Sequence, residues 1–106
     1  MKVLFILLVG ITRLSISENV TIIYKEAFRY CSNITGNIVF PESLTSIRKE
    51  AFQYCNSVDA FQFPHTTPLP YYINMFEKRV PVKVPSQAVS TYQSTNGWKE
   101  HTIIGY

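Results

Sequence analysis

Glu26-Ala27-Phe28-Arg29-Tyr30-Cys31 returns along the chain as Glu50-Ala51-Phe52-Gln53-Tyr54-Cys55, an offset of 50 − 26 = 24 residues. The residues before each copy also correspond, since residues 19–25 lie one period before residues 43–49. A fixed period of this length is typical of stacked repeats, in which each unit buries its apolar side only against its neighbours. Such proteins usually present a surface and do not enclose a reaction centre.

Matched positions in the two copies are predicted to lie one upon the other in a shared interior. These core positions are Ile23 and Ile47, Phe28 and Phe52, and Cys31 and Cys55. Stacking would place the two cysteine backbones about 5 Å apart, which permits a disulfide. Their Cβ vectors would run parallel, however, and this suits the bridge geometry poorly. A ladder of small buried thiols is therefore preferred over a disulfide.

Each unit is predicted to contain three local elements. An alternating strand ends at a proline, at residues 38–40 and again at 61–63, because proline cannot donate to a strand ladder. A second extended piece follows at residues 44–47. Residues 49–55 lack Gly and Pro and are interpreted as one helical turn or slightly more. A rival interpretation draws amphipathic helices over residues 19–34 and 43–58, which would make a small α+β domain. The β-favouring run at residues 21–24 counts against that alternative.

The two repeats are predicted at residues 18–64, and the segments before and after them are predicted to have other structures. Residues 1–17 have a positive start, a short apolar core and small residues, so they are interpreted either as a secretory signal peptide or as a partial first repeat. Residues 65–79 are predicted to be a proline-stiffened connector. Residues 80–106 are predicted to form a cap with a strand, a short helix beginning at Ser86 and a last strand, and Trp98 would cover the end of the core.

The sequence pattern of the repeat unit resembles that of the BspA-like class of leucine-rich repeat. Its strand, Pro, apolar-x-x-Ile, Ala-Phe and Cys appear in order between Phe40 and Val58. The tail is similar to the closing segment of such arrays through Val84-Pro85, Tyr92 and Gly97-Trp98. One departure is that Tyr24 and Arg48 occupy the position where the family often has Gly, which predicts a different turn there.

The resemblance implies an α/β fold, a short right-handed leucine-rich-repeat solenoid with a parallel β-sheet face and a C-terminal β-α-β cap. It also implies a secreted or cell-surface location and a role in adhesion or protein binding. The outward positions of the sheet face are then the candidate binding residues, namely Ser15, Asn37, Val39 and Gln62. The partner would be a protein or a glycan on that face, or further repeats of the same array. The alternative function is structural, as the C-terminal capping fragment of a longer array with no ligand of its own.

Little in the sequence points to catalysis, metal binding or nucleic acid. His65 and His101 have no partnered nucleophile, and two cysteines with two unaligned histidines do not make a credible zinc site. The net charge of +3 comes from scattered basic residues, so no nucleic-acid partner is expected. We therefore predict a non-enzymatic chain with no cofactor and no metal.

Tyr30 and Tyr54 are predicted to form an aromatic ladder beside the cysteines. This ladder can be interpreted as a stacking platform for a sugar or peptide, or as partial burial on the rim of the core. The second interpretation is preferred, because aromatic side chains contribute much apolar area to a core.

Overall fold

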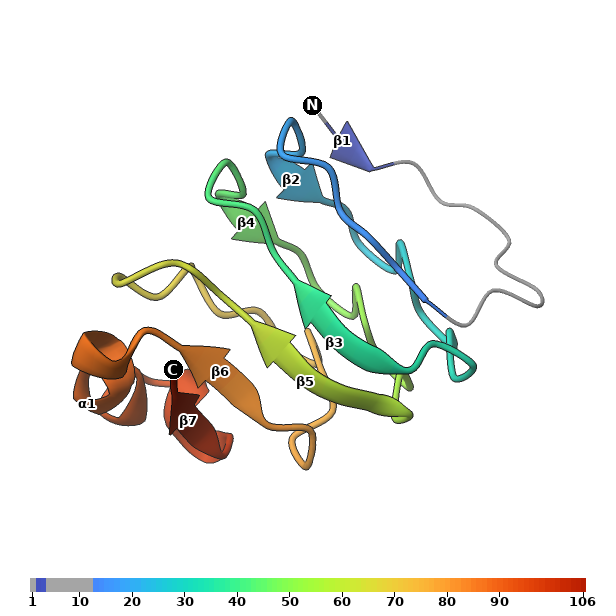
Figure 1. Cartoon of the computed structure of the whole chain (residues 1–106). Coiled ribbons are helices and arrows are strands. Elements are labelled where there is room, and N and C mark those ends of the chain that lie inside the picture. Colours follow the sequence, from blue (N-terminus) through green and yellow to red (C-terminus); the bar gives the residue numbers. More distant parts are fainter. Residues whose placement is uncertain (1, 4–12) are drawn as a thin grey trace.

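The computed structural model describes residues 2–3 and 13–106, and in these residues the chain runs through short parallel strands with little helix (Figure 1). The strands are β1 (Lys2–Val3), β2 (Ile22–Ile23), β3 (Gly36–Val39), β4 (Ser46–Ile47), β5 (Val58–Gln62), β6 (Val82–Val84) and β7 (Ile103–Gly105). The helices are the 3-10 turns η1 (Ser86–Ala88) and η2 (Trp98–Glu100) and the single-turn helix α1 (Val89–Gln93).

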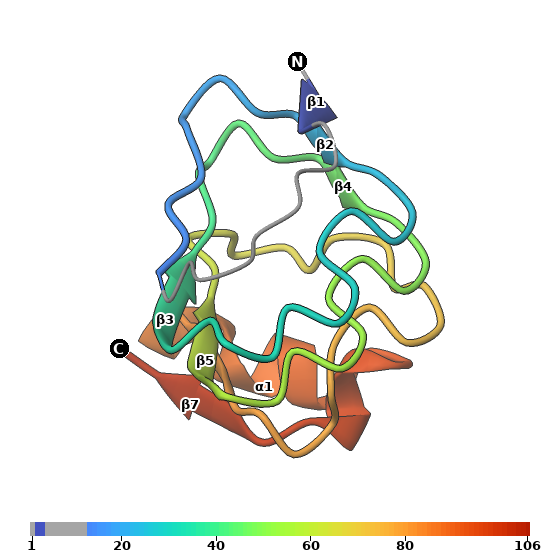
Figure 2. The same cartoon turned by 90° about the vertical axis from the view of Figure 1, so that its right-hand side faces the viewer.

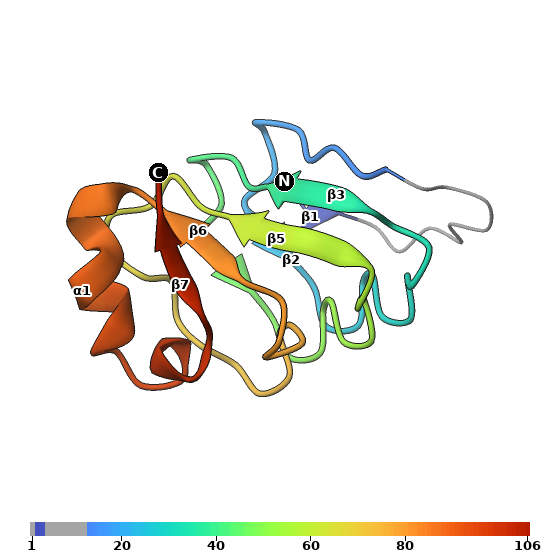
Figure 3. The ribbon, with the colours of Figure 1, turned by 60° about the horizontal axis from the view of Figure 1, so that its bottom comes forward.

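The strands form two parallel sheets, ordered β1-β2-β4 and β3-β5-β6-β7. In the first sheet Ile23 pairs with Ile47, so the strand register equals the 24-residue period of the sequence. In the second sheet Ile38 pairs with Phe61, and this sheet continues through β6 to β7 (Figure 3). Parallel sheets with few helices fit the predicted α/β repeat fold.

The predicted helical turn at residues 49–55 is wrong, because two residues of this loop are left-handed. Glu50 has a φ of 61° and Tyr54 a φ of 67°, and Glu26 and Tyr30 repeat these values at 62° and 66°. The left-handed residues turn alternate amides toward the next coil. Thus the Phe28 amide donates to the carbonyl of residue 51 at 2.8 Å, and the Tyr30 amide donates to that of residue 53 at 2.9 Å. The long helices of the α+β alternative are also absent from residues 19–34 and 43–58, which hold β2, β4 and these turns.

A third loop that begins in the same way lies within residues 65–79, the segment predicted to be a connector. The second left-handed position is not repeated there, because Lys78 lacks the positive φ of Tyr30 and Tyr54. Asn74 is left-handed, with a φ of 56°, one period after Glu50. The Phe52 amide donates to the Met75 carbonyl at 2.9 Å, as the Phe28 amide donates one coil earlier. The Tyr54 amide donates to a Glu77 carboxylate oxygen at 3.0 Å. This side-chain oxygen replaces the backbone carbonyl that accepts from the Tyr30 amide one coil earlier.

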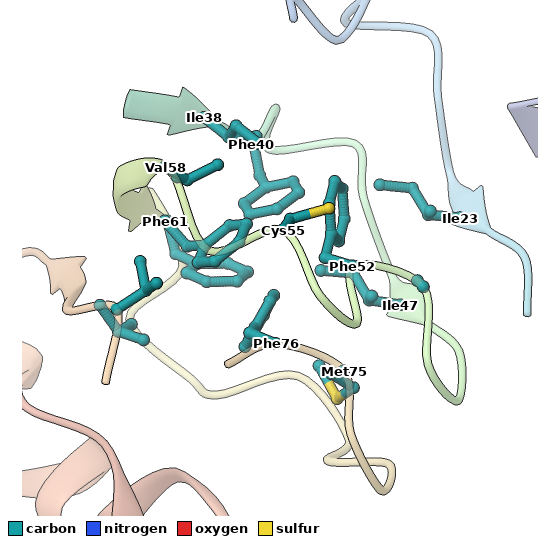
Figure 4. Packing of buried hydrophobic residues seen from close by; sticks show 14 of the residues in the cluster. Ile23, Ile38, Phe40, Ile47, Phe52, Cys55, Val58, Phe61, Met75 and Phe76 are labelled. Carbon is teal, nitrogen blue, oxygen red and sulfur yellow. The ribbon is translucent and has the colours of Figure 1, made fainter. Parts of the chain in front are cut away.

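Aromatic side chains fill the centre of the molecule and join its coils (Figure 4). Phe28 stacks on Phe52 with ring centroids 5.2 Å apart, and Phe76 follows 6.2 Å from Phe52. Of the other predicted core residues, Ile23, Ile47 and Cys55 are fully buried. Cys31 is only half-buried, so the predicted ladder of buried thiols is incomplete.

Both cysteines are free thiols. The Cys55 thiol donates to the Phe28 carbonyl oxygen at 2.9 Å. Burial raises the pKa of the Cys55 thiol to about 12, which keeps it protonated and chemically quiet at neutral pH.

Three aromatic side chains near the C-terminus donate hydrogen bonds to backbone carbonyls of residues 63–69. The Tyr106 hydroxyl donates to the Phe63 carbonyl at 2.9 Å, the Tyr92 hydroxyl to the carbonyl of residue 65 at 2.8 Å, and the Trp98 indole N–H to that of Leu69 at 2.8 Å. Trp98 and Tyr92 are themselves fully buried. The proline-rich stretch is therefore fixed against the end of the core.

Most of the signal-peptide or first-repeat segment, predicted at residues 1–17, lies outside the described residues. Within the described part, β1 pairs in parallel with β2, with Val3 opposite Ile23. Among the described residues, none of the helices has the length and apolar character needed to span a membrane.

Candidate functional site

One side chain from each strand of the larger sheet points outward, and the four are in register. Val39 pairs with Gln62, Gln62 with Lys83, and Lys83 with Ile104. The pleat explains this arrangement, because the preceding positions Ile38, Phe61 and Val82 are buried beneath the sheet. We call these four residues the outward row.

The outward row is apolar at its ends and polar in its centre. Val39 is 52% exposed and Ile104 is 39% exposed, while Gln62 and Lys83 are partly exposed between them. Neighbouring strands lie about 5 Å apart, so the row spans roughly 15 Å. Such a strip offers apolar contact, an amide and an ammonium group to a flat partner, and it holds no nucleophile or paired acid and base.

The structure brings together two of the four residues predicted for this face. Val39 and Gln62 lie side by side, and Asn37 is exposed on β3 opposite the buried Ala60, where the register shifts after Gly36. Ser15 is exposed but belongs to none of the described strands.

Two residues of the outward row, Lys83 and Ile104, were missed by the sequence reasoning. The signal was present in the alternation of Val82, Lys83 and Val84, because both valines are buried and the lysine between them points outward. The strand itself was predicted, but the face was not extended to it.

The stacked loops form a second exposed surface, on the side of the coils away from β3 and β5 (Figure 2). Tyr30 and Tyr54 stack there with ring centroids 4.7 Å apart and an interplanar angle of 14°. The Arg29 guanidinium lies over the Tyr30 ring at 5.0 Å and pairs with the Glu26 carboxylate at 2.8 Å. Lys25, Glu26, Arg29 and Tyr30 line an open hollow at this place.

Neither histidine belongs to an exposed reaction centre, since His101 is buried in the core and His65 is partly buried. His101 is buried, and its Nε2 atom shares a hydrogen bond of 2.7 Å with the Tyr71 hydroxyl. Burial, together with the Lys78 charge, lowers the pKa of His101, whereas Glu100 raises it slightly. His65 Nε2 lies 2.9 Å from the Leu44 carbonyl. Among residues 2–3 and 13–106, no three His, Cys, Asp or Glu side chains are grouped so as to hold a metal ion.

One comparison, a match to a protein-family model, agrees with the fold described above. It fits the stacked loops, the parallel sheets and the 24-residue register. The family model described as "BspA type Leucine rich repeat region (6 copies)" matches residues 3–80. The chain belongs to the BspA-type leucine-rich repeat family. The match extends beyond Pro64 and includes the third loop. Proteins of this family generally mediate protein interactions, are typically secreted or at the cell surface, and are generally not enzymes. No curated protein and no solved structure matches the chain.

Proposed function

We propose that this BspA-type chain is a non-catalytic, secreted or cell-surface module that binds a protein through its outward row. In this proposal the coils form a short right-handed solenoid, and residues 80–106 cap its end. The observation that carries the proposal is the register of Val39, Gln62, Lys83 and Ile104 across all the strands of the larger sheet.

The composition of the outward row favours a protein partner. Exposed Val39 and Ile104 give apolar area, and the amide and ammonium groups between them give directional contacts. Protein interfaces combine apolar contact with about one hydrogen bond per 100–200 Å². The extended face of a repeat protein suits such a partner better than a small ligand, which needs an enclosed pocket.

The experiment uses one chemical change at two places. Gln62→Glu adds a negative charge in the outward row, and Gln93→Glu adds the same charge at an exposed position of α1, outside the outward row. The chain and both variants are tested by biolayer interferometry against a panel of purified extracellular proteins. We expect at least one protein to bind the unmodified chain and the Gln93→Glu variant, and to bind the Gln62→Glu variant several-fold more weakly. Equal losses in the two variants, or none in either, would contradict a site on the sheet.

A purely structural role is the second candidate. It is favoured by the three hydrogen bonds from Tyr92, Trp98 and Tyr106 that close the C-terminal end of the core. A stable monomer that binds no member of the panel would support this capping role over protein binding.

A further inference from the structure

The stacked loops of residues 24–30, 48–54 and 72–79 form a continuous surface that we call the loop edge. Backbone hydrogen bonds fix one loop on the next, since the amide of residue 26 donates to the carbonyl of residue 49 at 3.3 Å, and that of residue 50 to the carbonyl of residue 73 at 3.2 Å. Figure 2 shows these loops on the side opposite β3 and β5. The loop edge is therefore separate from the outward row.

The loop edge carries all of the excess positive charge of the chain. Its basic residues are Lys25, Arg29, Arg48, Lys49, Lys78 and Arg79, and its acidic residues are Glu26, Glu50 and Glu77. Six minus three gives +3, which equals the formal net charge of the whole chain, so the other residues sum to zero. Two of the carboxylates are already engaged, Glu26 by Arg29 and Glu77 by the Tyr54 amide.

Two exposed tyrosines of the loop edge, Tyr30 and Tyr54, lie in the same loops as these charged residues. Tyr30 is 64% exposed and Tyr54 is 42% exposed, although burying aromatic area is favourable. Both are held in the left-handed region, where a bulky residue is rare and costs about 1–2 kcal/mol. Their rings face each other, so each covers the inner face of the other, and the Arg29 guanidinium lies beside the pair, 5.0 Å from the Tyr30 ring centroid and 5.9 Å from that of Tyr54.

We propose that the loop edge binds an acidic polysaccharide, an extended chain that carries sulfate or carboxylate groups. Lys25 and Lys49 occupy equivalent positions on coils that lie about 5 Å apart, so a linear polyanion running along the stack meets two lysines in succession, and Lys78 and Arg79 follow in the third loop. Tyr30 lines the hollow together with Lys25 and Arg29, where its side chain can contact a sugar ring.

Two other polyanions fit the loop edge less well. Single-stranded nucleic acid needs open aromatic faces for base stacking. The inner faces of Tyr30 and Tyr54 cover each other at a centroid distance of 4.7 Å, so no base can insert between them and the pair offers no run of open faces to successive bases. An acidic peptide that binds by strand addition needs free backbone groups, and the amides of residues 26, 28 and 30 are used between the coils.

The experiment measures binding of the full chain to immobilised heparin, with dextran as the neutral polysaccharide. Lys49→Gln is the test variant, and Lys99→Gln, an exposed lysine on η2, is the matched control. We expect binding to heparin and not to dextran, weaker binding at 0.5 M NaCl because salt screens surface charges, and roughly two- to fivefold weaker binding for Lys49→Gln alone. Circular dichroism of both variants verifies that they are folded.

Three results would overturn the proposal. The first is equal binding to heparin and dextran, and the second is the same loss for Lys49→Gln and Lys99→Gln. The third is tighter binding to polyuridylic acid or polyglutamate than to heparin, which would assign the loop edge to a different polyanion.

Discussion

At the scale of single residues, the unusual feature is the left-handed residue at the third position of each loop. Glu26 and Glu50 adopt this conformation in the first two loops, and Asn74 takes the place in the third. Asn visits the left-handed region at lower cost than most other residues that carry a Cβ atom, Glu and Tyr included. The third loop therefore already contains the residue that the geometry prefers.

We predict that Glu50→Asn stabilises the chain by about 1 kcal/mol. The Glu50 amide keeps its hydrogen bond to the Ile73 carbonyl, since this bond involves only backbone atoms. The free energy of unfolding from urea titration checks the prediction. Lys49→Asn, one residue earlier and outside the left-handed region, is the control and should bring no gain. A stability for Glu50→Asn below that of the unmodified chain would show that the glutamate side chain is needed there.

Buried His101 predicts a pH dependence of stability. Its pKa is lowered in the folded chain because burial penalises the charged ring, and the ordinary value is 6.5. The unfolded chain then binds the proton more readily, so the free energy of unfolding decreases as the pH falls below about 6.5. Ordinary carboxylates titrate near pH 4 and contribute little between pH 7.5 and about 5.5.

Urea midpoints at these two pH values measure the effect. We expect a lower midpoint at the acidic pH for the unmodified chain, and a smaller difference for His101→Phe, which cannot titrate. His101→Phe also loses the hydrogen bond to Tyr71, so its stability should be lower at both pH values. An equally large pH effect in the variant would assign the dependence to another group.

At the scale of elements, the period and the strands could be predicted, and the loops could not. Ile38 and Phe61 alternate with their neighbours and end at prolines, so local pattern was enough to locate these strands. The helical prediction at residues 49–55 failed because Glu and Tyr rarely adopt positive φ. Their conformation is set by hydrogen bonds between coils, which no local pattern reveals.

The third loop was missed for a related reason. Asn74-Met75-Phe76 stands where the earlier copies have Glu-Ala-Phe, so only the phenylalanine keeps its identity. The 24-residue spacing was the remaining signal. In the outward row, Val39 and Gln62 followed from alternation, and the same argument applied to β6 would have added Lys83.

At the scale of the whole molecule, one aromatic cluster joins what could otherwise be separate coils. Repeat proteins are stabilised mainly by contacts between neighbouring units, so distant units can unfold separately. Here Phe52 contacts Phe28 in one coil and Phe76 in the next, and Phe76 lies 5.9 Å from Trp98 near the C-terminus. A chain of aromatic contacts therefore runs from the first loop to the last elements.

This continuity predicts a single cooperative unfolding transition, which Phe52→Ala should shift as a whole. Loss of a buried Phe costs about 3–5 kcal/mol, a large share of the roughly 5–15 kcal/mol typical of small domains. Trp98 is the one tryptophan of the chain, so its fluorescence reports the C-terminal end while far-UV circular dichroism reports the backbone. We expect both signals to move to the same lower urea concentration in Phe52→Ala. Ile73→Ala, at an exposed side chain, should change stability by less than about 0.5 kcal/mol. If the fluorescence midpoint stayed in place while the backbone signal shifted, the C-terminal elements would be folding independently of the coils.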